Sequence, residues 1–140
     1  MALLTGTEDI KRVLRESKSV AVLGANVKES KAAHYVPRYL YGEGYTIYPV
    51  NPVHDGKTLF GEPFCSNLRD LQRPIDVVDV FRRSEALSEH LEDFLAMEPR
   101  PKVVWFQSGI RHDEVAQELS DAGIDVIQSR CMLADHQRLL

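Results

Sequence analysis

Residues 19–26 read Ser-Val-Ala-Val-Leu-Gly-Ala-Asn, and this stretch decides the fold class of the chain. A short run of apolar residues without alternation is typical of a β-strand that is covered on both faces. The single glycine permits a sharp turn, and a helical pattern follows over residues 31–41. The order strand, tight turn, helix places backbone N–H groups and a helix N-terminus at the end of a buried strand, which favours a phosphate group.

The same alternation repeats along the chain and predicts an α/β domain. Pro37 conflicts with a regular helix, which it either kinks or opens in the first turn. Short apolar strands that alternate with helices predict a five-stranded, mainly parallel sheet with helices on both faces, in one domain over residues 1–140. Strands are expected at 20–23, 45–50, 75–81, 103–106 and 124–127, helices at 7–17, 31–41, 85–97 and 112–122, a short helix at 66–71, a loop at 53–62, and no assigned element from residue 131 onward.

Several helix ends are signalled by single polar residues. Thr7, which precedes two acids, and Ser84 carry hydroxyls that suit N-caps of the helices that follow them. His112 is expected at a helix start. Trp105, on a predicted strand, is expected in the core.

Composition excludes several classes of function. The net charge of −4 argues against a chain-wide field for nucleic acid or an anionic membrane. Cys65 and Cys131 lie far apart, and the five histidines show no ligand spacing, so no metal site is predicted. The N-terminal residues lack a targeting pattern, and no apolar run is long enough to span a bilayer. We therefore expect a cytoplasmic protein with reduced thiols.

Candidate binding residues follow the predicted strands, because ligands of parallel α/β sheets bind at the carboxyl ends of the strands. In the first such loop, Gly24 lets a ligand approach the backbone, and the N–H groups from Ala25 through Asn26 to Val27 would cradle a phosphate. The alternative is an ordinary strand–helix turn, since a dinucleotide fingerprint would have three glycines. Lys31 is either a point charge for the phosphate or a solvated surface lysine.

The third strand is followed directly by Phe81, Arg82 and Arg83. Two guanidinium groups at a strand end can clamp a phosphate, or they can pair with Glu85 or Asp79. Asp79 interrupts a run of valines, and a buried aspartate needs a partner, for which an arginine or a backbone N–H is expected.

Two further loops border the same edge of the sheet. Asn51 and Pro52 stop the second strand where an NAD-dependent dehydrogenase would carry an acid for the ribose hydroxyls, or they form a plain turn. The loop Gln107-Ser108-Gly109 either lets a ligand lie across it or forms a capping turn.

No catalytic residue is predicted. Cys131 is read as a buried structural thiol, because a nucleophile needs a base that the sequence does not place. His34 is expected on the surface, with an orientation toward the phosphate loop as the alternative.

These segments together resemble the small CoA-binding domain proteins, which are similar to the N-terminal domain of the succinyl-CoA synthetase alpha subunit. One position departs from the family pattern, because Asn26 stands where the family commonly has serine. The matching pieces are Val-Leu-Gly-Ala-Asn at 22–26, Tyr-Pro-Val-Asn-Pro at 48–52, Leu-Arg-Asp-Leu at 68–71, Val-Asp-Val-Phe-Arg-Arg at 78–83, Val-Trp-Phe-Gln-Ser-Gly-Ile at 104–110, Ala-Gly-Ile at 122–124 and Arg-Cys-Met at 130–132.

The resemblance implies a Rossmann-like domain that binds coenzyme A (CoA). The phosphates would lie near residues 24–27 and the adenosine near Asn51 and Pro52. Segments 81–83 and 107–109 would border the ligand, with Lys31 and His34 as neighbours on the following helix.

The resemblance also bears on activity. The synthetase needs a phosphorylated histidine and a nucleotide-grasp subunit, neither of which this sequence carries, so we expect binding of CoA or an acyl-CoA without catalysis. The alternatives are an NAD(P)-dependent enzyme on the same fold and a partner protein that leaves the cleft unused. The expected partner is a small molecule, with a protein partner or homo-oligomer left open, and a mixed disulfide of Cys131 with CoA is a further hypothesis.

Overall fold

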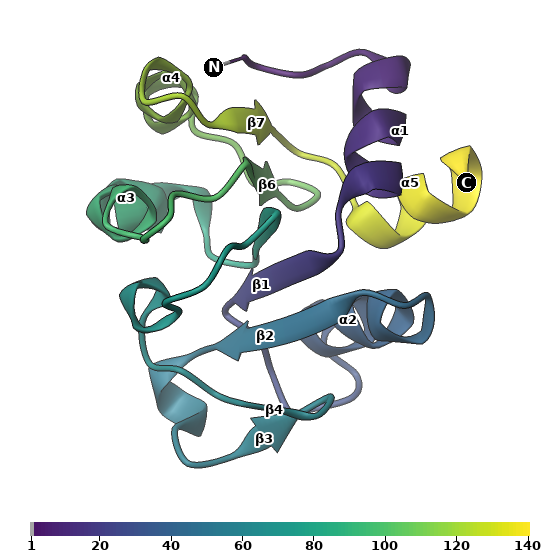
Figure 1. The fold of residues 1–140 in the computed structure, drawn as a ribbon, viewed down its shortest axis with the longest axis vertical. Coiled ribbons are helices and arrows are strands. Elements are labelled where there is room, and N and C mark those ends of the chain that lie inside the picture. The colour runs from purple at the N-terminus through teal and green to yellow at the C-terminus, as the bar shows by residue number, and fades with distance from the viewer. Residues whose placement is uncertain (1) are drawn as a thin grey trace.

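The computed structural model describes residues 2–140, so Met1, the first residue of the expected domain and of the N-terminal segment, lies outside it. Within residues 2–140 a five-stranded, all-parallel sheet forms the centre of the molecule (Figure 1), with strand order β2-β1-β5-β6-β7. The five strands are β1 (Ser19–Leu23), β2 (Thr46–Val50), β5 (Val77–Val80), β6 (Val103–Phe106) and β7 (Asp125–Ile127).

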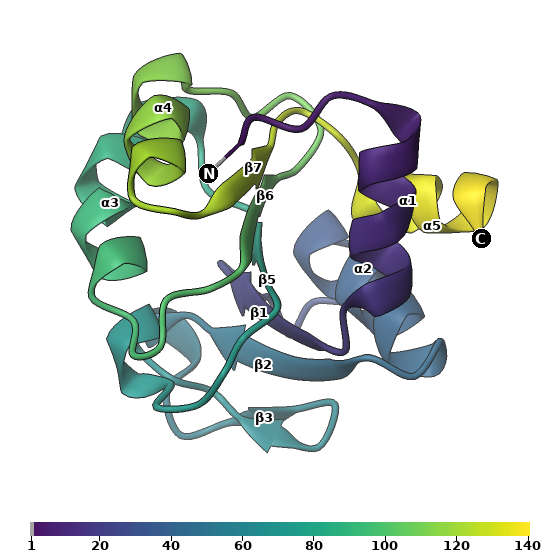
Figure 2. The same cartoon turned by 45° about the horizontal axis from the view of Figure 1, so that its top comes forward.

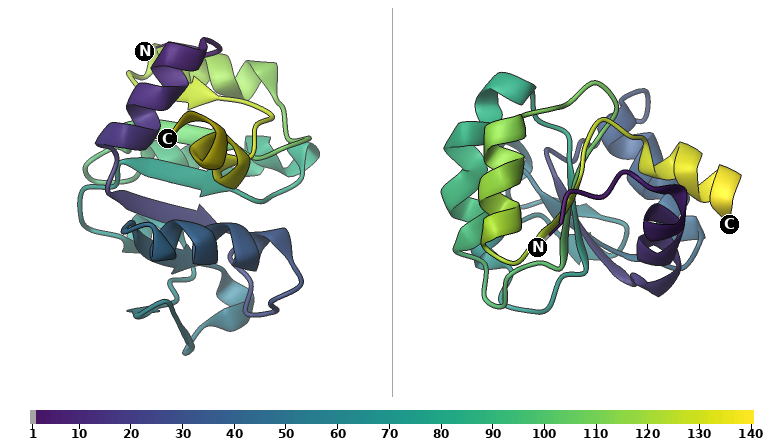
Figure 3. Two further views of the ribbon diagram at one scale, coloured as in Figure 1. Left: turned by 90° about the vertical axis from the view of Figure 1, so that its right-hand side faces the viewer. Right: turned by 90° about the horizontal axis from the view of Figure 1, so that it is seen from above.

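Helices cover both faces of the sheet, which makes the three layers that the sequence predicted. Figures 2 and 3 show α1, α2 and α5 on one face and α3 and α4 on the other. The helices are α1 (Thr7–Glu16), α2 (Ala32–Gly42), α3 (Leu87–Leu95), α4 (Asp113–Asp121) and α5 (Met132–Leu139).

The apolar residues form two clusters, one on each side of the sheet. Successive residues of a strand point to opposite faces. Val20 and Val22 of β1 therefore pack with α1, α2 and α5, whereas Ala21 and Leu23 pack with α3 and α4. Trp105 is fully buried in the first cluster, which confirms its expected place in the core. Burial on both faces explains why the strands read as continuous apolar runs.

The structure adds elements that the sequence did not predict. A small antiparallel hairpin, β3 (Thr58–Leu59) with β4 (Glu62–Pro63), occupies the end of the segment 53–62 that was expected as loop and extends one residue beyond it. Helix α5 occupies the tail that had no assignment. Within the described residues, no helix has the length and apolar character of a membrane span.

Two of the expected helix caps are wrong. Thr7 is the first residue of α1, and Gly6 stands at the N-cap position. Ser84 opens a 3-10 turn, Ser84–Ala86, that precedes α3, and its Oγ accepts the N–H of Arg111 at 2.9 Å. The Ser84 hydroxyl therefore joins the loop after β5 to the loop after β6, and it caps neither α3 nor α4. His112 stands at the N-cap of α4, at the helix start as expected, and its Nδ1 accepts the N–H of Val115 at 3.2 Å.

The strand order creates the crevice where ligands bind in such sheets. From β1 the chain first pairs β2 on one side and later β5 on the other. The loops after β1 and β5 therefore lead to opposite faces, because their helices cover opposite faces. This topological switch point places the two loops at one open edge.

Candidate functional site

A cleft of about 590 Å³ opens at the carboxyl ends of β1, β5 and β6, at the switch point. Its volume lies within the range of small-molecule sites, about 300–1,000 Å³. The walls come from the loops after these strands, from the first turns of α2, and from the start of α5. The lining residues are Gly24, Asn26, Lys31, Ala32, Ala33, Tyr35, Val36, Asn51, Phe81, Arg82, Arg83, Gln107, Ser108, Ile110 and Cys131.

Gly24 holds the two loops of the switch point close together. Its φ is +92°, and a Cβ at this position would lie 2.8 Å from the carbonyl oxygen of Phe81. The Gly24 N–H donates to Val50 at 2.8 Å, and the Phe81 N–H donates to Leu23 at 2.9 Å. A side chain at residue 24 would therefore collide with backbone that both neighbouring strands hold in place. The glycine is required by the packing of the protein itself, and not only by the approach of a ligand.

The loop after β1 is braced from inside by α2. Pro37 lies within α2 and has no N–H, so the carbonyl of Ala33, four residues before it, has no helical donor. The Asn26 N–H takes that place and donates to the Ala33 oxygen at 3.2 Å. The apparent conflict between Pro37 and a helix is thus resolved by the loop.

His34 lies behind the loop and not on the surface, which corrects the sequence-based expectation. Its side chain is only 6% exposed, and its Nδ1 lies 2.9 Å from the carbonyl oxygen of Asn26, to which it donates. The predicted amide cradle is correspondingly reduced, because the N–H groups of Ala25 and Asn26 both have protein acceptors.

Asn51 also serves the loop. Its Nδ2 donates to the Ala25 carbonyl at 3.0 Å, and its Oδ1 accepts the N–H of Val53 at 3.1 Å. Both ends of the amide are therefore engaged in a buried position. The turn that stood as the alternative for Asn51 and Pro52 is present as a 3-10 turn at Pro52–His54, and the Asn51 side chain also ties the end of β2 to the loop after β1.

Cations dominate the polar lining of the cleft. Lys31, Arg82 and Arg83 contribute three positive charges, and no carboxylate stands among the lining residues, although the whole chain has a net charge of −4. Arg83 meets Glu85 at 3.7 Å, in an exposed pair. Arg82 is half-buried, its Nε has no partner among the described residues, and burial lowers the pKa of its guanidinium. A partly desolvated cation without a partner attracts an anionic group.

Asp79 lies behind this wall, fully buried on β5. Its Oδ1 accepts a hydrogen bond from Gln107 Nε2 at 2.7 Å, so the partner is a side-chain amide and not the expected arginine or backbone N–H. Within residues 2–140 its Oδ2 has no partner. Burial raises the pKa of the Asp79 carboxyl to about 7, which the Gln107 hydrogen bond only partly opposes.

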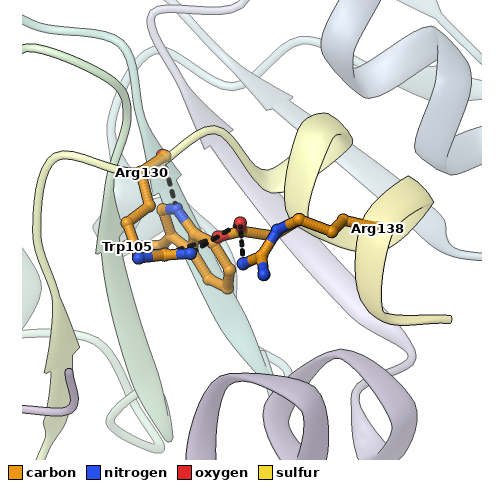
Figure 4. A network of polar contacts seen from close by, with 4 residues as sticks. Trp105, Arg130 and Arg138 are labelled. Atoms are coloured by element: carbon orange, nitrogen blue, oxygen red, sulfur yellow. Dashed lines mark hydrogen bonds and ion pairs between the residues drawn. The ribbon is translucent and has the colours of Figure 1, made fainter. Parts of the chain in front are cut away.

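The start of α5 brings Cys131 to the cleft wall. Arg130 binds Asp135 through two hydrogen bonds of 2.7 and 2.8 Å, and Arg138 adds a third to the same carboxylate. Trp105 Nε1 donates to the Arg130 carbonyl at 2.8 Å (Figure 4). This network fixes the loop, and it leaves the Cys131 thiol half-buried in the cleft instead of in the core.

The structure brings most of the predicted residues together. Nine of the fourteen candidates line the cleft: Gly24, Asn26, Lys31, Asn51, Phe81, Arg82, Arg83, Gln107 and Ser108. The other five, Ala25, Val27, His34, Pro52 and Gly109, stand outside the lining, and Ala25 and His34 are buried behind it.

Sequence reasoning missed the contribution of the helices. Tyr35 and Val36 line the cleft from α2. Tyr35 lies four residues after Lys31, a spacing that places two side chains on one helix face and is a usable signal, whereas Val36 carries no such signal. Among the described residues, no group of three or more metal-ligating side chains occurs.

The chain belongs to the CoA binding domain family, whose sequence profile matches residues 18–137. It is 38% identical over 128 residues to the uncharacterized protein YneT of Bacillus subtilis strain 168, with 91% of this chain and 92% of that protein covered. A solved Thermus thermophilus structure shares 46% identity, with a TM-score of 0.92 and coverage of 97% and 100%. A hypothetical protein from Pyrococcus horikoshii OT3 shares 32% identity, with a TM-score of 0.87 and coverage of 96% and 92%. The Rossmann-like α/β fold is thereby confirmed.

Proposed function

We propose that this protein binds CoA or an acyl-CoA in the cleft at the switch point and has no catalytic activity of its own. The observation that carries the proposal is the charge of the cleft, which gathers three cations and no carboxylate in a chain of net charge −4. CoA carries a diphosphate and a further phosphate on its nucleotide half. Membership of the CoA binding domain family supports this ligand.

The residues of the cleft fit such a ligand. Arg82 would offer its guanidinium to a phosphate group, and Lys31 would add a point charge. The N-terminus of α2 opens on the cleft through Ala32 and Ala33, where the first helical N–H groups have no partner within the helix. Val36 and Ile110 supply apolar surface for the neutral parts of the ligand.

The composition of the lining supports a binding role without catalysis. General acid–base chemistry most often uses a histidine or a carboxylate that reaches the ligand. Among the described residues, neither type lines the cleft, and Cys131 stands there without such a neighbour in the lining. The proposed activity is therefore recognition.

An NAD(P)-dependent enzyme is the alternative, and Asn51 argues against it. Its side chain occupies the end of β2, where an acid would hold the ribose hydroxyls, and both ends of its amide are already hydrogen-bonded within the protein. The positive charges of Arg82 and Arg83 would also suit the 2′-phosphate of NADPH, so the test includes NADPH.

Calorimetry with purified protein tests the proposal. We expect binding of CoA and acetyl-CoA at micromolar concentrations and no heat with NADH or NADPH. Arg82→Gln should weaken CoA binding at least about tenfold, because a charge-assisted hydrogen bond is lost. Arg12→Gln is the matched control, since Arg12 lies on α1 in an exposed pair with Asp9. A folded protein that gives no heat with CoA, or that prefers NADPH, would overturn the proposal.

The remaining expectations about setting are part of the same proposal. A cytoplasmic location with reduced thiols suits the two free cysteines, Cys65 and Cys131. The net charge supports a small-molecule ligand over nucleic acid or a membrane surface. Native mass spectrometry of freshly purified protein would show a bound ligand, a homo-oligomer or a protein partner in one measurement.

A further inference from the structure

The buried pair of Asp79 and Gln107 determines which atom the protein presents to its ligand. A carboxylate only accepts hydrogen bonds, so the Gln107 amide must turn its nitrogen toward Asp79. The 2.7 Å contact between Nε2 and Oδ1 is this hydrogen bond. The amide orientation is therefore set from behind the cleft by a residue that does not line the cleft itself.

The other end of the amide is available to the ligand. Gln107 lines the cleft, and its Oε1 makes no hydrogen bond to the described residues. Gln107 is only 5% exposed, but its Oε1 is not among the fully buried polar atoms that lack a partner, so this atom keeps a small accessible area. The wall at the end of β6 thus offers a carbonyl acceptor and not a donor.

The position of this acceptor separates it from the loop after β1, although Arg82 and Arg83 follow the neighbouring strand β5. Gln107 follows β6, whereas Gly24 follows β1, and β5 lies between these two strands. Neighbouring strands are about 4.8 Å apart, so the two loops stand roughly 10 Å from each other. A ligand whose phosphates lie at the N-terminus of α2 would bring a different segment past Gln107, and an uncharged segment that carries a donor suits a carbonyl acceptor.

We propose that Gln107 is a specificity-determining residue that accepts a hydrogen bond from an N–H or O–H group on the uncharged arm of the ligand, and that Asp79 is the positioning residue that keeps its carbonyl oxygen turned to the cleft. The inference rests on the proposed function, because it assumes that CoA occupies this cleft. The pantetheine arm of CoA carries two amide N–H groups and a hydroxyl, which are donors of the required kind.

The hydrogen bond between Asp79 and Gln107 could orient the Gln107 amide for the ligand, or it could only join β5 to β6. A variant in which this amide can take either orientation distinguishes the two roles. Asp79→Asn keeps the shape and one hydrogen bond. An asparagine can either accept from Gln107 or donate to it, so the amide of Gln107 is no longer forced into one orientation. The double variant Asp79→Asn, Gln107→Glu restores an acceptor in the cleft, because the introduced glutamate would receive the N–H of the introduced asparagine on one oxygen and present the other.

The experiment compares two probes by calorimetry at pH 8, where Asp79 is ionised because its pKa is about 7. The probes are CoA and adenosine 3′,5′-bisphosphate, which is a phosphorylated nucleotide without the pantetheine arm. We expect Asp79→Asn to weaken CoA binding about five- to tenfold and to leave bisphosphate binding within twofold. The double variant should recover most of the affinity for CoA. Gln107→Met removes the acceptor directly and should lower CoA affinity to a similar degree.

Each result decides the inference. Equal losses for both probes would show a structural role and overturn it, as would unchanged CoA affinity in Asp79→Asn and Gln107→Met. Should Asp79→Asn fail to fold, the CoA-to-bisphosphate ratio in Gln107→Met decides. Wild-type protein that does not bind CoA refutes the proposed function at the first measurement, whereas wild-type binding with insensitive variants refutes only the role of this pair.

Discussion

Two aspartates near opposite ends of β5 have side-chain pKa values that are shifted in opposite directions. Asp76, just before the strand, accepts the backbone N–H groups of Lys18 and Ser19 at 2.8 and 3.2 Å, and Lys102 lies 3.3 Å from its other oxygen. Although burial acts to raise it, these partners hold the pKa of Asp76 below its ordinary value. Asp79, three residues later, has one partner, Gln107, and a pKa raised to about 7.

The difference separates a closed end of the sheet from an open one. At the amino ends of the strands, each oxygen of Asp76 is satisfied by the protein, and the contact joins the loops before β1, β5 and β6. At the carboxyl ends, Asp79 Oδ2 and Arg82 Nε have no partner among the described residues. Unsatisfied buried groups reduce stability, and two of the three such atoms among the described residues lie at the cleft, the third being His54 Nδ1 in the 3-10 turn after β2.

The largest expected effect comes from Gly24→Val at the open end. Positive φ alone costs a side chain about 1–2 kcal/mol, and the contact with the Phe81 oxygen at 2.8 Å requires the backbone to move. We expect a loss of about 5 kcal/mol in the free energy of unfolding, enough to depopulate the folded state, and loss of ligand binding with it. Urea denaturation followed by circular dichroism measures the change.

Gly44→Val is the matched control at the closed end. Gly44 precedes β2 with φ +100°, and a Cβ there would meet no atom within 4 Å. Strain without collision should cost only about 1–2 kcal/mol. Equal losses in the two variants would show that the close approach of the loops after β1 and β5 has no energetic weight.

Asp79 should give the next largest effect, as a dependence of stability on pH. Its folded-state pKa of about 7 lies above the ordinary value of 3.8, so the folded protein binds the proton more tightly than the unfolded chain. Stability from this group is full below pH 3.8, falls as the pH rises, and is lost above about 7. Each pH unit in this window contributes about 1.4 kcal/mol, so the loss reaches at most about 4 kcal/mol.

Asp79→Asn removes this titration. The unfolding free energy of the variant minus that of the wild type should rise between pH 4 and 7 and then stay constant. Thermal and urea unfolding of both proteins at several pH values give this difference directly. A difference that does not change over the window would mean that Asp79 is already compensated by a group in the fold.

Asp76→Asn should show the opposite pH dependence and a smaller effect. The carboxylate has a lowered folded-state pKa, so its contribution is present above pH 3.8 and is lost as the pH falls below that value. At pH 7 we expect a loss of about 2 kcal/mol, since charge-assisted hydrogen bonds to two backbone N–H groups and Lys102 are weakened. The same unfolding series between pH 2.5 and 7 tests it. A variant as stable as the wild type at pH 7 would contradict the assignment of Asp76 as a fully compensated carboxylate.

The sequence predicted the sheet because each strand carries its own signal. Val20 to Leu23 and Val103 to Phe106 are buried on both faces, and continuous apolar character follows directly from that burial. Helix α5 carries no such signal. Its position depends on contacts with residues distant in the sequence, such as Tyr39 with His136 at 2.8 Å. Contacts of that kind are set by the tertiary structure and leave no periodic pattern.

For the candidate site, the sequence predicted the positions of the loops but not the contacts of their side chains. Strand-end loops can be located from strand positions alone, so Gly24, Arg82 and Gln107 were found. The state of each side chain could not be read in this way. His34 is turned inward by the Asn26 carbonyl, and Asp79 pairs with a residue 28 positions later. Such pairings depend on which strands become neighbours.

The smallest expected effect concerns the exposed pair of Arg83 and Glu85, and it separates the two arginines of the open end. Their side chains are 85% and 72% exposed and 3.7 Å apart, so the pair contributes less than about 0.5 kcal/mol to stability. Glu85→Gln should therefore leave the unfolding free energy unchanged within error. It should also raise CoA affinity by less than about twofold at low salt, because Arg83 loses a competing anion. Urea denaturation and calorimetry at two salt concentrations measure both quantities. A stability loss above about 1 kcal/mol would mean that exposed ion pairs stabilise the open end. The difference between the open and the closed end would then depend on Arg83 as well as on Arg82.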